Sequence, residues 1–404
     1  MWEKKGQPTF FTEQFDHLVG EKDKFRLIKE SVDFSFVNEL ARPYYHQMGA
    51  SGYAPDKLYR CLLVMYLENI RSERELEEHL RFNIRYRYFC DLDIADPIPD
   101  HSTFSVFRTR LGAEAFCEIF DRLVEAVLDF GVATPTHFSV DSTSVLADCA
   151  HSRAGKKSDT DAAYGPRAGG KQIFFGYKAH NLIDSESEIV IETEATPGNM
   201  KDIPSARRLL AKVASRHGIS PEHLAADKAY SAIAFRRELK EQDIVPVIPQ
   251  QKGGTKGGFL KEMFNFNSDG DLICPAGRKM KAQCRYGDGR VEYTGNGCNT
   301  CEFKSKCTKA SRRRVTLSMY ESEKRIYEQF QMTAEFQKLY VKRNAVERVA
   351  ANLKRWHGLE RAKFRCLWKV DYQTKMAATA NNLKKLAGWL KNAPPQALRG
   401  QANG

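Results

Sequence analysis

The spacing of apolar residues changes after Pro135, and this change limits the fold more than any other feature of the sequence. Residues 1–131 repeat apolar side chains at helical intervals, most clearly in residues 56–70. Beyond Pro135 come short segments rich in β-branched and aromatic residues, bounded by turn residues and later separated by helical segments. Strands in succession followed by alternating helix and strand are typical of a mixed α/β sheet. The expected strands are HFSVDSTSVL, KQIFFGYKAHNLI, EIVIETEA, HLAADKAY and DIVPVIP.

Local signals place the ends of several N-terminal helices. Ser72 followed by Glu75 fits a capping box, and we expect the helix that it opens to run through the Arg-rich residues 80–89. Another helix is expected to begin near Ser102, and a further one to end at Gly131, because glycine commonly terminates helices. Arginines on exposed helix faces suit a DNA-binding bundle, and an ordinary helical domain fits the pattern equally well.

Two stretches interrupt the expected sheet. Residues 152–171 are Gly-rich and basic and are expected to form a mobile loop, whereas residues 250–314 form a Cys-rich insertion. The chain is therefore expected to contain a helical DNA-binding domain (1–131), a first part of the α/β domain (132–249), the insertion (250–314), a second, helical part of the α/β domain (315–393) and a disordered tail (394–404).

The charge balance favours a polyanionic partner. The chain has 63 Lys and Arg against 51 Asp and Glu, a net charge of +12, so nucleic acid is the simplest partner; extra surface lysine is the alternative. The longest unbroken apolar run, Cys61–Leu67, is far shorter than the about 20 residues of a membrane-spanning helix. The first residues also lack the apolar segment of a secretory signal. We therefore expect a cytoplasmic protein, not associated with a membrane, whose ten cysteines are reduced or bind metal.

Three acidic residues stand out as candidates for metal-dependent chemistry. Asp141 and Asp227 each follow a short apolar run, where an expected strand meets a polar turn, and Glu347 lies within a helical segment. Hard divalent cations prefer carboxylate oxygens, and a pair of such cations can drive phosphodiester chemistry. The alternative is that the two aspartates cap turns and that Glu347 is a solvated helix residue.

The segment around Glu347 gives that residue a distinctive face. If residues 340–358 form one helix, Tyr340, Arg343, Glu347 and Lys354 fall within an arc of about 60°. The cations on this face would suit the phosphates of a DNA strand, although a plain solvated face remains the alternative. The opposite face, which we expect to be buried, consists of Val346, Val349, Leu353 and Trp356.

Five of the ten cysteines fall in the insertion. Cys298 and Cys301 form a C-x2-C turn, Cys307 follows after five residues, and Cys274 starts a second turn. Four cysteines of this kind match the tetrahedral thiolate site of structural zinc, with Cys284 as a spare or substitute ligand. A small reduced module without metal is the alternative, but a loop-rich segment of this size needs a bound metal or another cross-link to fold.

At the acidic residues the chain resembles a known family. Tyr340, Arg343, Glu347 and Lys354 reproduce the Y-x2-R-x3-E-x6-K signature of bacterial insertion-sequence transposases with a DDE catalytic triad. The resemblance extends over about residues 20–390 and implies a ribonuclease-H-like fold, with the first Asp on the first strand and the second Asp on the fourth. The expected strand order agrees with that placement. Other matching motifs are VDSTS, GYKAH, TPGNMKD, ADKAYSA and, in the DNA-binding region, PDHSTFSVFRTRLG.

The resemblance also implies a function. Such an enzyme binds the inverted repeats at the ends of its own element, cuts there, and joins the exposed 3′-hydroxyls to double-stranded target DNA, as a homodimer on DNA in the bacterial nucleoid. Asp141, Asp227 and Glu347 would hold two Mg²⁺ ions, for which Mn²⁺ can substitute. Arg343 and Lys354 would bind DNA backbone phosphates near the cleavage site. A transposase-derived DNA-binding protein and a metal-dependent nuclease without strand transfer are the alternatives.

Further side chains fit this mechanism less directly. Tyr340 would pack or hydrogen-bond near the cut. Lys178 and His180 alternate on one face of the GYKAH strand and could reach the scissile phosphate, or else form a structural salt bridge and a buried histidine. Phe264 and Phe266 could stack a base flipped out of a DNA hairpin, but packing in a core is the favoured alternative.

Overall fold

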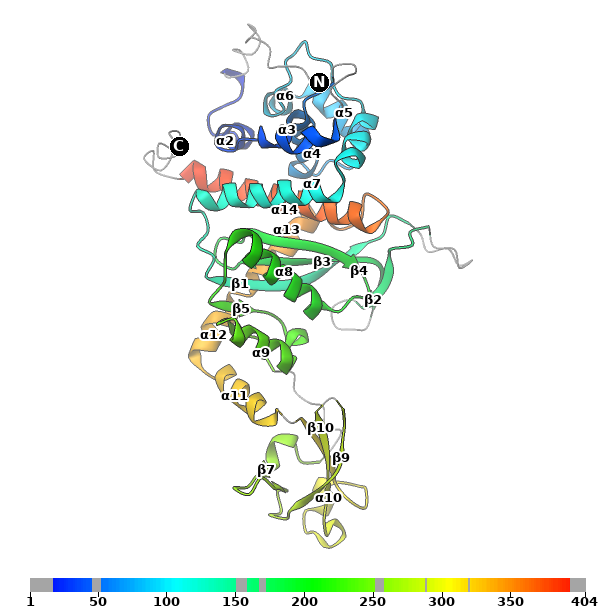
Figure 1. Cartoon of the computed structure of the whole chain (residues 1–404), viewed down its shortest axis with the longest axis vertical. Coiled ribbons are helices and arrows are strands. Elements are labelled where there is room, and N and C mark those ends of the chain that lie inside the picture. The colour runs from blue at the N-terminus through cyan, green and yellow to red at the C-terminus, as the bar shows by residue number, and fades with distance from the viewer. Residues whose placement is uncertain are drawn as a thin grey trace. The chain divides into compact units, whose positions relative to one another are not determined.

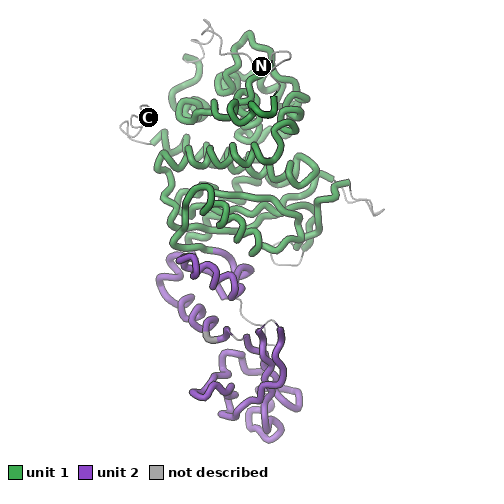
Figure 2. The backbone as a smooth tube through the Cα atoms, viewed as in Figure 1, with its two compact units in different colours: residues 1–225, 341–404 green, residues 226–340 purple. Residues whose placement is uncertain are grey.

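The structure is a computed structural model that describes residues 17–45, 52–149, 158–166, 172–250, 258–287, 289–318 and 320–392. It contains two compact units, one of residues 1–225 and 341–404 and the other of residues 226–340 (Figure 2). The N-terminal helices share the first unit with β1 to β5, and the Cys-rich insertion belongs to the second. The functional boundaries expected from the sequence stay predictions, and the expected tail lies outside the described residues.

The N-terminal part of the first unit is helical. Ser72 caps a helix as expected, because its side-chain oxygen accepts a hydrogen bond from the Glu75 N–H at 3.2 Å. The expected continuation of that helix through residues 80–89 is wrong: the backbone of Asn83 is extended, and its side chain caps a separate helix. The helices are α2 (Lys24–Ser31), α3 (Phe36–Ala41), α4 (Pro55–Leu67), α5 (Glu73–Phe82), α6 (Ile84–Phe89) and α7 (His101–Asp129).

Helix α7 unites the two helices expected on either side of residue 112. Gly112 has a φ of 71°, so the chain kinks there without a full break. The Asp100 carboxylate caps the first turn by accepting from the Ser102 N–H at 2.7 Å. Gly131 has a φ of 69° and follows the last turn, as the sequence predicts for a glycine stop.

The first unit also holds a mixed sheet. Strand β3 pairs antiparallel with both β1 and β4, and β5 pairs parallel with β1. This arrangement is that of the ribonuclease-H-like fold, as expected. The short strand β2 pairs with β3 in the stretch that was expected to be a loop; the rest of that stretch lies largely outside the described residues. The strands are β1 (His137–Leu146), β2 (Ala163–Pro166), β3 (Ile173–Asp184), β4 (Val190–Pro197) and β5 (His223–Ala225).

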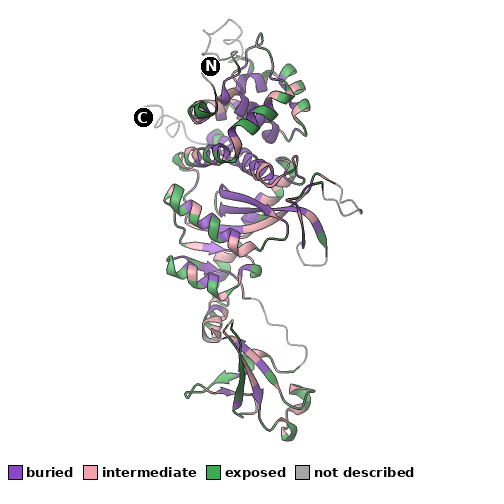
Figure 3. Cartoon of the chain, turned by 45° about the vertical axis from the view of Figure 1, so that its right-hand side comes forward, coloured by how far each residue is buried: buried purple, intermediate pink, exposed green. Residues whose placement is uncertain are grey.

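Helices cover both faces of this sheet (Figure 1). Helix α8 (Asp202–His217) packs on β3 and β4, while α13 (Asn344–Trp356) packs on β1 and β3. Gly218 ends α8 in the left-handed conformation that favours glycine. The central strands are therefore buried almost throughout (Figure 3), and Leu182, Ile183 and Val190 have no exposed surface.

Helix α14 (Leu367–Asn392) protects the edge strand β4 by bonding to its backbone. The Asn382 amide accepts from the Val190 N–H at 2.9 Å and donates to the Val190 carbonyl at 2.8 Å. The Asp371 carboxylate accepts from the Ala195 N–H at 2.7 Å, and Lys375 Nζ donates to the Thr193 carbonyl at 3.0 Å. An edge strand that is bonded in this way cannot recruit another strand.

The second unit contains the insertion. Strands β9, β10 and β11 form an antiparallel sheet beside the β7–β8 hairpin, and one face of the sheet covers a small core of Phe264, Leu272, Met280, Val315 and Leu317. The elements are η2 (Lys228–Tyr230), α9 (Ile233–Glu241), β6 (Val245–Val247), η3 (Lys261–Met263), β7 (Asn265–Phe266), β8 (Leu272–Ile273), β9 (Met280–Arg285), β10 (Arg290–Gly295), η4 (Cys298–Thr300), α10 (Lys304–Cys307), β11 (Arg314–Ser318), α11 (Glu321–Gln331) and α12 (Ala334–Val341).

Across the described ranges, no helix combines the length and the apolar character that crossing a membrane requires.

His357, at the end of α13, makes the first unit sensitive to acid. Its side chain is buried, Nδ1 donates to the Tyr66 carbonyl at 2.9 Å, and burial lowers the pKa of the imidazole to about 4. An unfolded histidine has a pKa near 6.5, so the unfolded chain binds the proton first as the pH falls. The stabilising effect of neutral His357 is therefore present above about pH 6.5 and is lost as the pH falls through about 4.

We expect this histidine to contribute up to about 3 kcal/mol to the loss of unfolding free energy between pH 6.5 and 4. His357→Gln should reduce that loss, whereas His79→Gln, at a side chain that is 45% exposed, should not. Urea unfolding followed by tryptophan fluorescence at several pH values measures the difference. Equal acid sensitivity of His357→Gln and the unaltered chain would remove His357 as a cause.

Candidate active site

Asp141 lies in the middle of β1 and not at its end. The strand has the bounds expected for HFSVDSTSVL, His137–Leu146, so only the polar turn that was also expected at Asp141 is wrong. The polar residues that follow Asp141 pair with β3 throughout, and Asp141 itself lies opposite Asn181. Central placement in a paired strand fixes the backbone of Asp141, while its side chain remains 29% exposed.

The segment around Glu347 is two helices and not one. Helix α12 ends at Val341, residues 342 and 343 form a turn, and α13 begins at Asn344. Tyr340 is therefore on α12, and the expected single face that joined it to Glu347 is wrong. Arg343 stands at the N-cap of α13, and Glu347 lies in the first turn.

The buried face of α13 is largely as expected. Val346, Val349 and Leu353 have at most 1% of their surface exposed. Trp356 is 52% exposed, so its expected place in the core is wrong. It is the last residue of the helix, about 60° around the axis from Leu353, and the Arg355 guanidinium lies over its ring at 4.8 Å.

Arg343 brings two of the candidate acids together. Its Nη1 lies 3.6 Å from Oδ2 of Asp141, and its Nη2 forms an ion pair with Oε1 of Glu347, four residues along. The guanidinium is thus placed between a carboxylate from the sheet and one from the helix. The Arg343 side chain is only 12% exposed, whereas that of Glu347 is 56% exposed and open to solvent.

Lys354 links the far end of α13 to the same strand. Its Nζ lies 3.4 Å from the Ser144 hydroxyl and 3.9 Å from a carboxylate oxygen of Glu360. Asp141, Arg343, Glu347 and Lys354 are therefore gathered along β1 and the helix that packs on it.

Asp227 belongs to the second unit. It follows β5 by two residues, and its side chain caps η2 by accepting from the Ala229 N–H at 2.8 Å. The turn-capping role that the sequence allowed for this residue is thus observed, and its part in a metal site stays a proposal. Tyr340 also lies in the second unit, where its ring stacks on Phe336 with centroids 5.6 Å apart.

Two transposase family models match parts of this chain. A family model described as a transposase domain (DUF772) matches residues 13–110, and a model described as a transposase DDE domain matches residues 273–387. The second match contains Arg343, Glu347 and Lys354. The chain belongs to the DDE transposases. A cryo-EM structure of a piggyBac transposase synaptic complex with hairpin DNA is 10% identical, with a TM-score of 0.42 over 92% of this chain and 76% of that chain.

Lys178 and His180 of the transposase are buried on the other face of the sheet. They lie opposite Ser144 and Ser142, whereas Asp141 lies opposite Asn181, so their side chains leave the sheet on the side away from Asp141. Lys178 Nζ pairs with Asp202 at 2.8 Å, beneath α8. The structure therefore supports the structural alternative for this lysine.

His180 is equally enclosed. It has no exposed surface, and its Nε2 is bonded to the Thr196 hydroxyl at 2.8 Å. Burial lowers the pKa of its imidazole, so it remains neutral. The arrangement supports the buried, hydrogen-bonded histidine that the sequence left open.

Sequence reasoning missed the residues that hold α13 in place. Lys342 Nζ pairs with Glu186 at 2.7 Å, and Arg348 pairs with Glu188 at 2.6 Å, both in the turn between β3 and β4. The hydrogen bond from Lys342 lowers the pKa of the Glu186 carboxyl. Because the partners are more than 150 residues apart, no local pattern could have revealed them.

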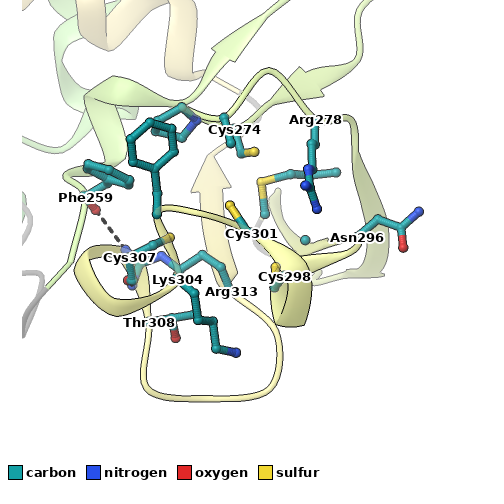
Figure 4. Close-up of a pocket in the computed structure, with 15 residues that line it drawn as sticks. Phe259, Cys274, Arg278, Asn296, Cys298, Cys301, Lys304, Cys307, Thr308 and Arg313 are labelled. Carbon is teal, nitrogen blue, oxygen red and sulfur yellow. Dashed lines mark hydrogen bonds between the residues drawn. The ribbon is translucent and has the colours of Figure 1, made fainter.

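Four cysteines of the insertion line one small cavity of about 30 Å³ (Figure 4). Cys274 follows β8, Cys298 begins η4, Cys301 follows it, and Cys307 ends α10. Figure 4 shows their sulfur atoms turned toward the same space. Cys284 is exposed on β9 and does not line the cavity, which is otherwise bounded mainly by Phe259, Met280, Phe303 and Arg313.

Two further details bear on this cavity. Burial raises the pKa of the Cys307 thiol. A Cβ on residue 295 would come within 2.6 Å of Cys298 Sγ, so only glycine leaves room for that sulfur.

The two phenylalanines considered for base stacking differ in burial. Phe264 is fully buried in the adjoining core, as the favoured alternative predicted, while Phe266 is 43% exposed and packs edge-on against Tyr293.

Glu77, Asp100 and His101 form another compact group among the described residues, with ligand atoms within 4.8 Å of one another. Glu77 accepts from the His101 N–H at 3.1 Å, and Asp100 is the cap of α7. These contacts explain the cluster as the start of a helix, and we assign no metal to it.

Proposed function

We propose that the transposase binds the terminal inverted repeats of an insertion sequence, cuts at the element ends and joins the 3′-hydroxyls to target DNA by two-metal phosphoryl transfer. The observation that carries this proposal is the convergence of Asp141 and Glu347 on the Arg343 guanidinium. Acids from a central strand and a covering helix meet there at a partly exposed surface.

The donor set fits divalent cations. Carboxylate oxygens are the ligands that Mg²⁺ prefers, and Mn²⁺ accepts the same ligands. The two carboxylates already hold one positive group between them, the guanidinium of Arg343. When bound, two ions would activate the attacking hydroxyl and stabilise the leaving oxygen. Arg343, once displaced from the acids, is placed to contact a DNA phosphate beside them.

Chain connectivity supports Asp227 as the third acid. Strands β1 and β5 run parallel, and Ala225 pairs with Ser139. Asp141 and Asp227 each follow the paired residue by two positions. Two residues span at most about 7 Å, so the backbone of Asp227 cannot lie far from Ala225. Glu347, Asp141 and Asp227 are therefore the proposed metal ligands.

The N-terminal helices supply a surface that suits DNA. The first half of α7 exposes Ser102, Ser105, Val106, Thr109 and Arg110, and no acidic residue lies among positions 101–111. A helix with such a face fits the major groove of a duplex. Near the cut, Tyr340, Arg343 and Lys354 are the proposed DNA contacts. Cutting two element ends calls for a homodimer on DNA, and we place the protein with the nucleoid in the cytoplasm.

Incubation with the DNA that flanks its own gene tests this function. With Mg²⁺ we expect cuts that map to both element ends, 3′-hydroxyl products, and joining of those ends to a supercoiled plasmid. Without divalent metal, binding should remain and cutting should stop. Binding without any cut would assign a DNA-binding protein, and cuts without joining would assign a nuclease; either result overturns the proposal.

We further propose that Cys274, Cys298, Cys301 and Cys307 hold one structural Zn²⁺. Four thiols from two turns form the ligand set that tetrahedral zinc takes, and binding replaces their protons with the metal. No three of these sulfur atoms lie within 4.8 Å of one another, so ligation would draw the turns together. Among the described residues, the core beside them contains five buried side chains, and a core of this size favours additional stabilisation by a bound metal.

A further inference from the structure

The insertion carries an excess of positive charge that its own acids do not balance. Its described residues between 258 and 318 include twelve Lys and Arg against five Asp and Glu. Some of these cations have a structural task. Lys279 pairs with Asp271, and Arg313 turns inward to donate to the Phe259 carbonyl at 2.9 Å.

Other cations of the insertion are exposed and have no ion pair with any residue that the structure describes. They are Lys281, Arg285, Lys306, Lys309, Arg312 and Arg314. Like charges repel when they gather on a small module, so their accumulation costs stability unless a polyanion neutralises it. An external anionic partner is therefore the simplest reason for this surface.

The sheet arranges two of these cations side by side. Thr294, on the central strand β10, pairs with Lys281 on β9 and with Arg314 on β11. Residues that pair across strands point to the same face, and two strand spacings place their Cα atoms about 10 Å apart. Thr294 itself is buried, whereas Lys281 and Arg314 are exposed. We call the surface formed by Lys281 and Arg314, on either side of Thr294, the basic sheet face.

The two faces of the sheet differ in character. Val315 and Leu317, on the inner face, are buried in the small core. On the outer face, Glu292 is the acidic residue among the paired positions, and Cys284 and Thr316 are its neighbours across the strands. No large apolar side chain accompanies the cations there, so neither a membrane surface nor an apolar protein partner suits this face.

We propose that the basic sheet face binds the sugar–phosphate backbone of duplex DNA without sequence preference, which makes the insertion a second DNA-contacting element of the transposase. This proposal rests on the proposed function in taking DNA as the substrate. Lys and Arg that neutralise phosphates release condensed counterions, and each contact adds about 0.9 to the slope of log K against log salt. The inference therefore has a quantitative signature that the catalytic acids do not share.

The test measures how salt weakens the binding of the full chain to a labelled random-sequence duplex, by fluorescence anisotropy. Mg²⁺ is omitted so that no cutting occurs, and chelators are omitted so that any zinc remains. The Lys281→Gln/Arg314→Gln variant should bind more weakly, and its slope should be shallower by about 2. Because the measurement needs no catalysis, it succeeds or fails independently of cleavage.

A matched control is Lys279→Gln/Asp271→Asn, which neutralises an ion pair in the same module and leaves the net charge unchanged. It should retain the original slope, and circular dichroism should show the same fold for both variants. A slope for Lys281→Gln/Arg314→Gln equal to that of the control overturns the proposal. Tighter binding to duplex RNA than to DNA, lost in the same variant, would assign the face to RNA and also overturn it.

Discussion

The Glu347→Gln variant is expected to lose Mg²⁺-dependent nicking at the element ends by about 10²–10³-fold or more, while its DNA affinity stays within about threefold. The amide keeps the shape of the side chain but removes the negative charge that a hard cation requires. Folding should be unaffected, because the Glu347 side chain is 56% exposed and exposed ion pairs contribute little to stability.

The matched control for this change is Glu360→Gln. Glu360 also lies beside a cation of the site, 3.9 Å from Lys354, and its side chain is 64% exposed. It carries no proposed metal, so the control should nick at the original rate. Asp141→Asn should lose activity as Glu347→Gln does. Nicking by Glu347→Gln at the rate of the control would exclude Glu347 from the metal site.

A second measurement separates metal binding from DNA contact. If Glu347 acts only on the metal, raising the Mg²⁺ or Mn²⁺ concentration should restore part of the nicking, and the salt dependence of DNA binding should not change. Arg343→Gln should instead change DNA binding. The slope of log K for DNA binding against log salt should become shallower by about 1, because the variant removes one phosphate contact. A change of slope in Glu347→Gln would instead indicate that the acid acts through Arg343.

The fold followed from local sequence where each element carried its own signal. Apolar alternation and turn residues located strands β1, β3, β4 and β5 of the sheet. Glycine residues marked the ends of helices α7 and α8. Strand β1 has the expected bounds, but the polar turn expected at Asp141 is absent. The polar residues after Asp141 remain in the strand because they pair with β3, whose residues are distant in sequence.

The break between α12 and α13 had no local signal. The residues at the turn include Lys342 and Arg343, which favour helix, and no glycine or proline lies among residues 334–357. The chain turns there while Lys342 bonds Glu186 and Arg343 reaches Asp141, contacts made by residues distant in sequence. The sequence thus identified which side chains gather at β1, but the tertiary ion pairs determine how they are presented.

Removal of zinc is expected to unfold the Cys-rich part of the second unit. Structural zinc sites contribute about 10–16 kcal/mol in small zinc-folded domains. By comparison, the adjoining core contains five buried residues among those that the structure describes, and strand β9 of its sheet is exposed beyond Met280. The purified chain should contain about one zinc per chain, and Cys301→Ser should lose it and become sensitive to protease within residues 258–318.

Cys284→Ser is the control, because Cys284 lies on the exposed edge strand β9 and does not line the cavity. It should keep both the zinc and the protease resistance, which separates loss of a ligand from loss of any cysteine. Zinc measured by mass spectrometry and limited proteolysis report the two effects independently. A purified chain that holds no zinc yet resists protease in this region would show that apolar packing and reduced thiols suffice, and the metal site would have to be abandoned.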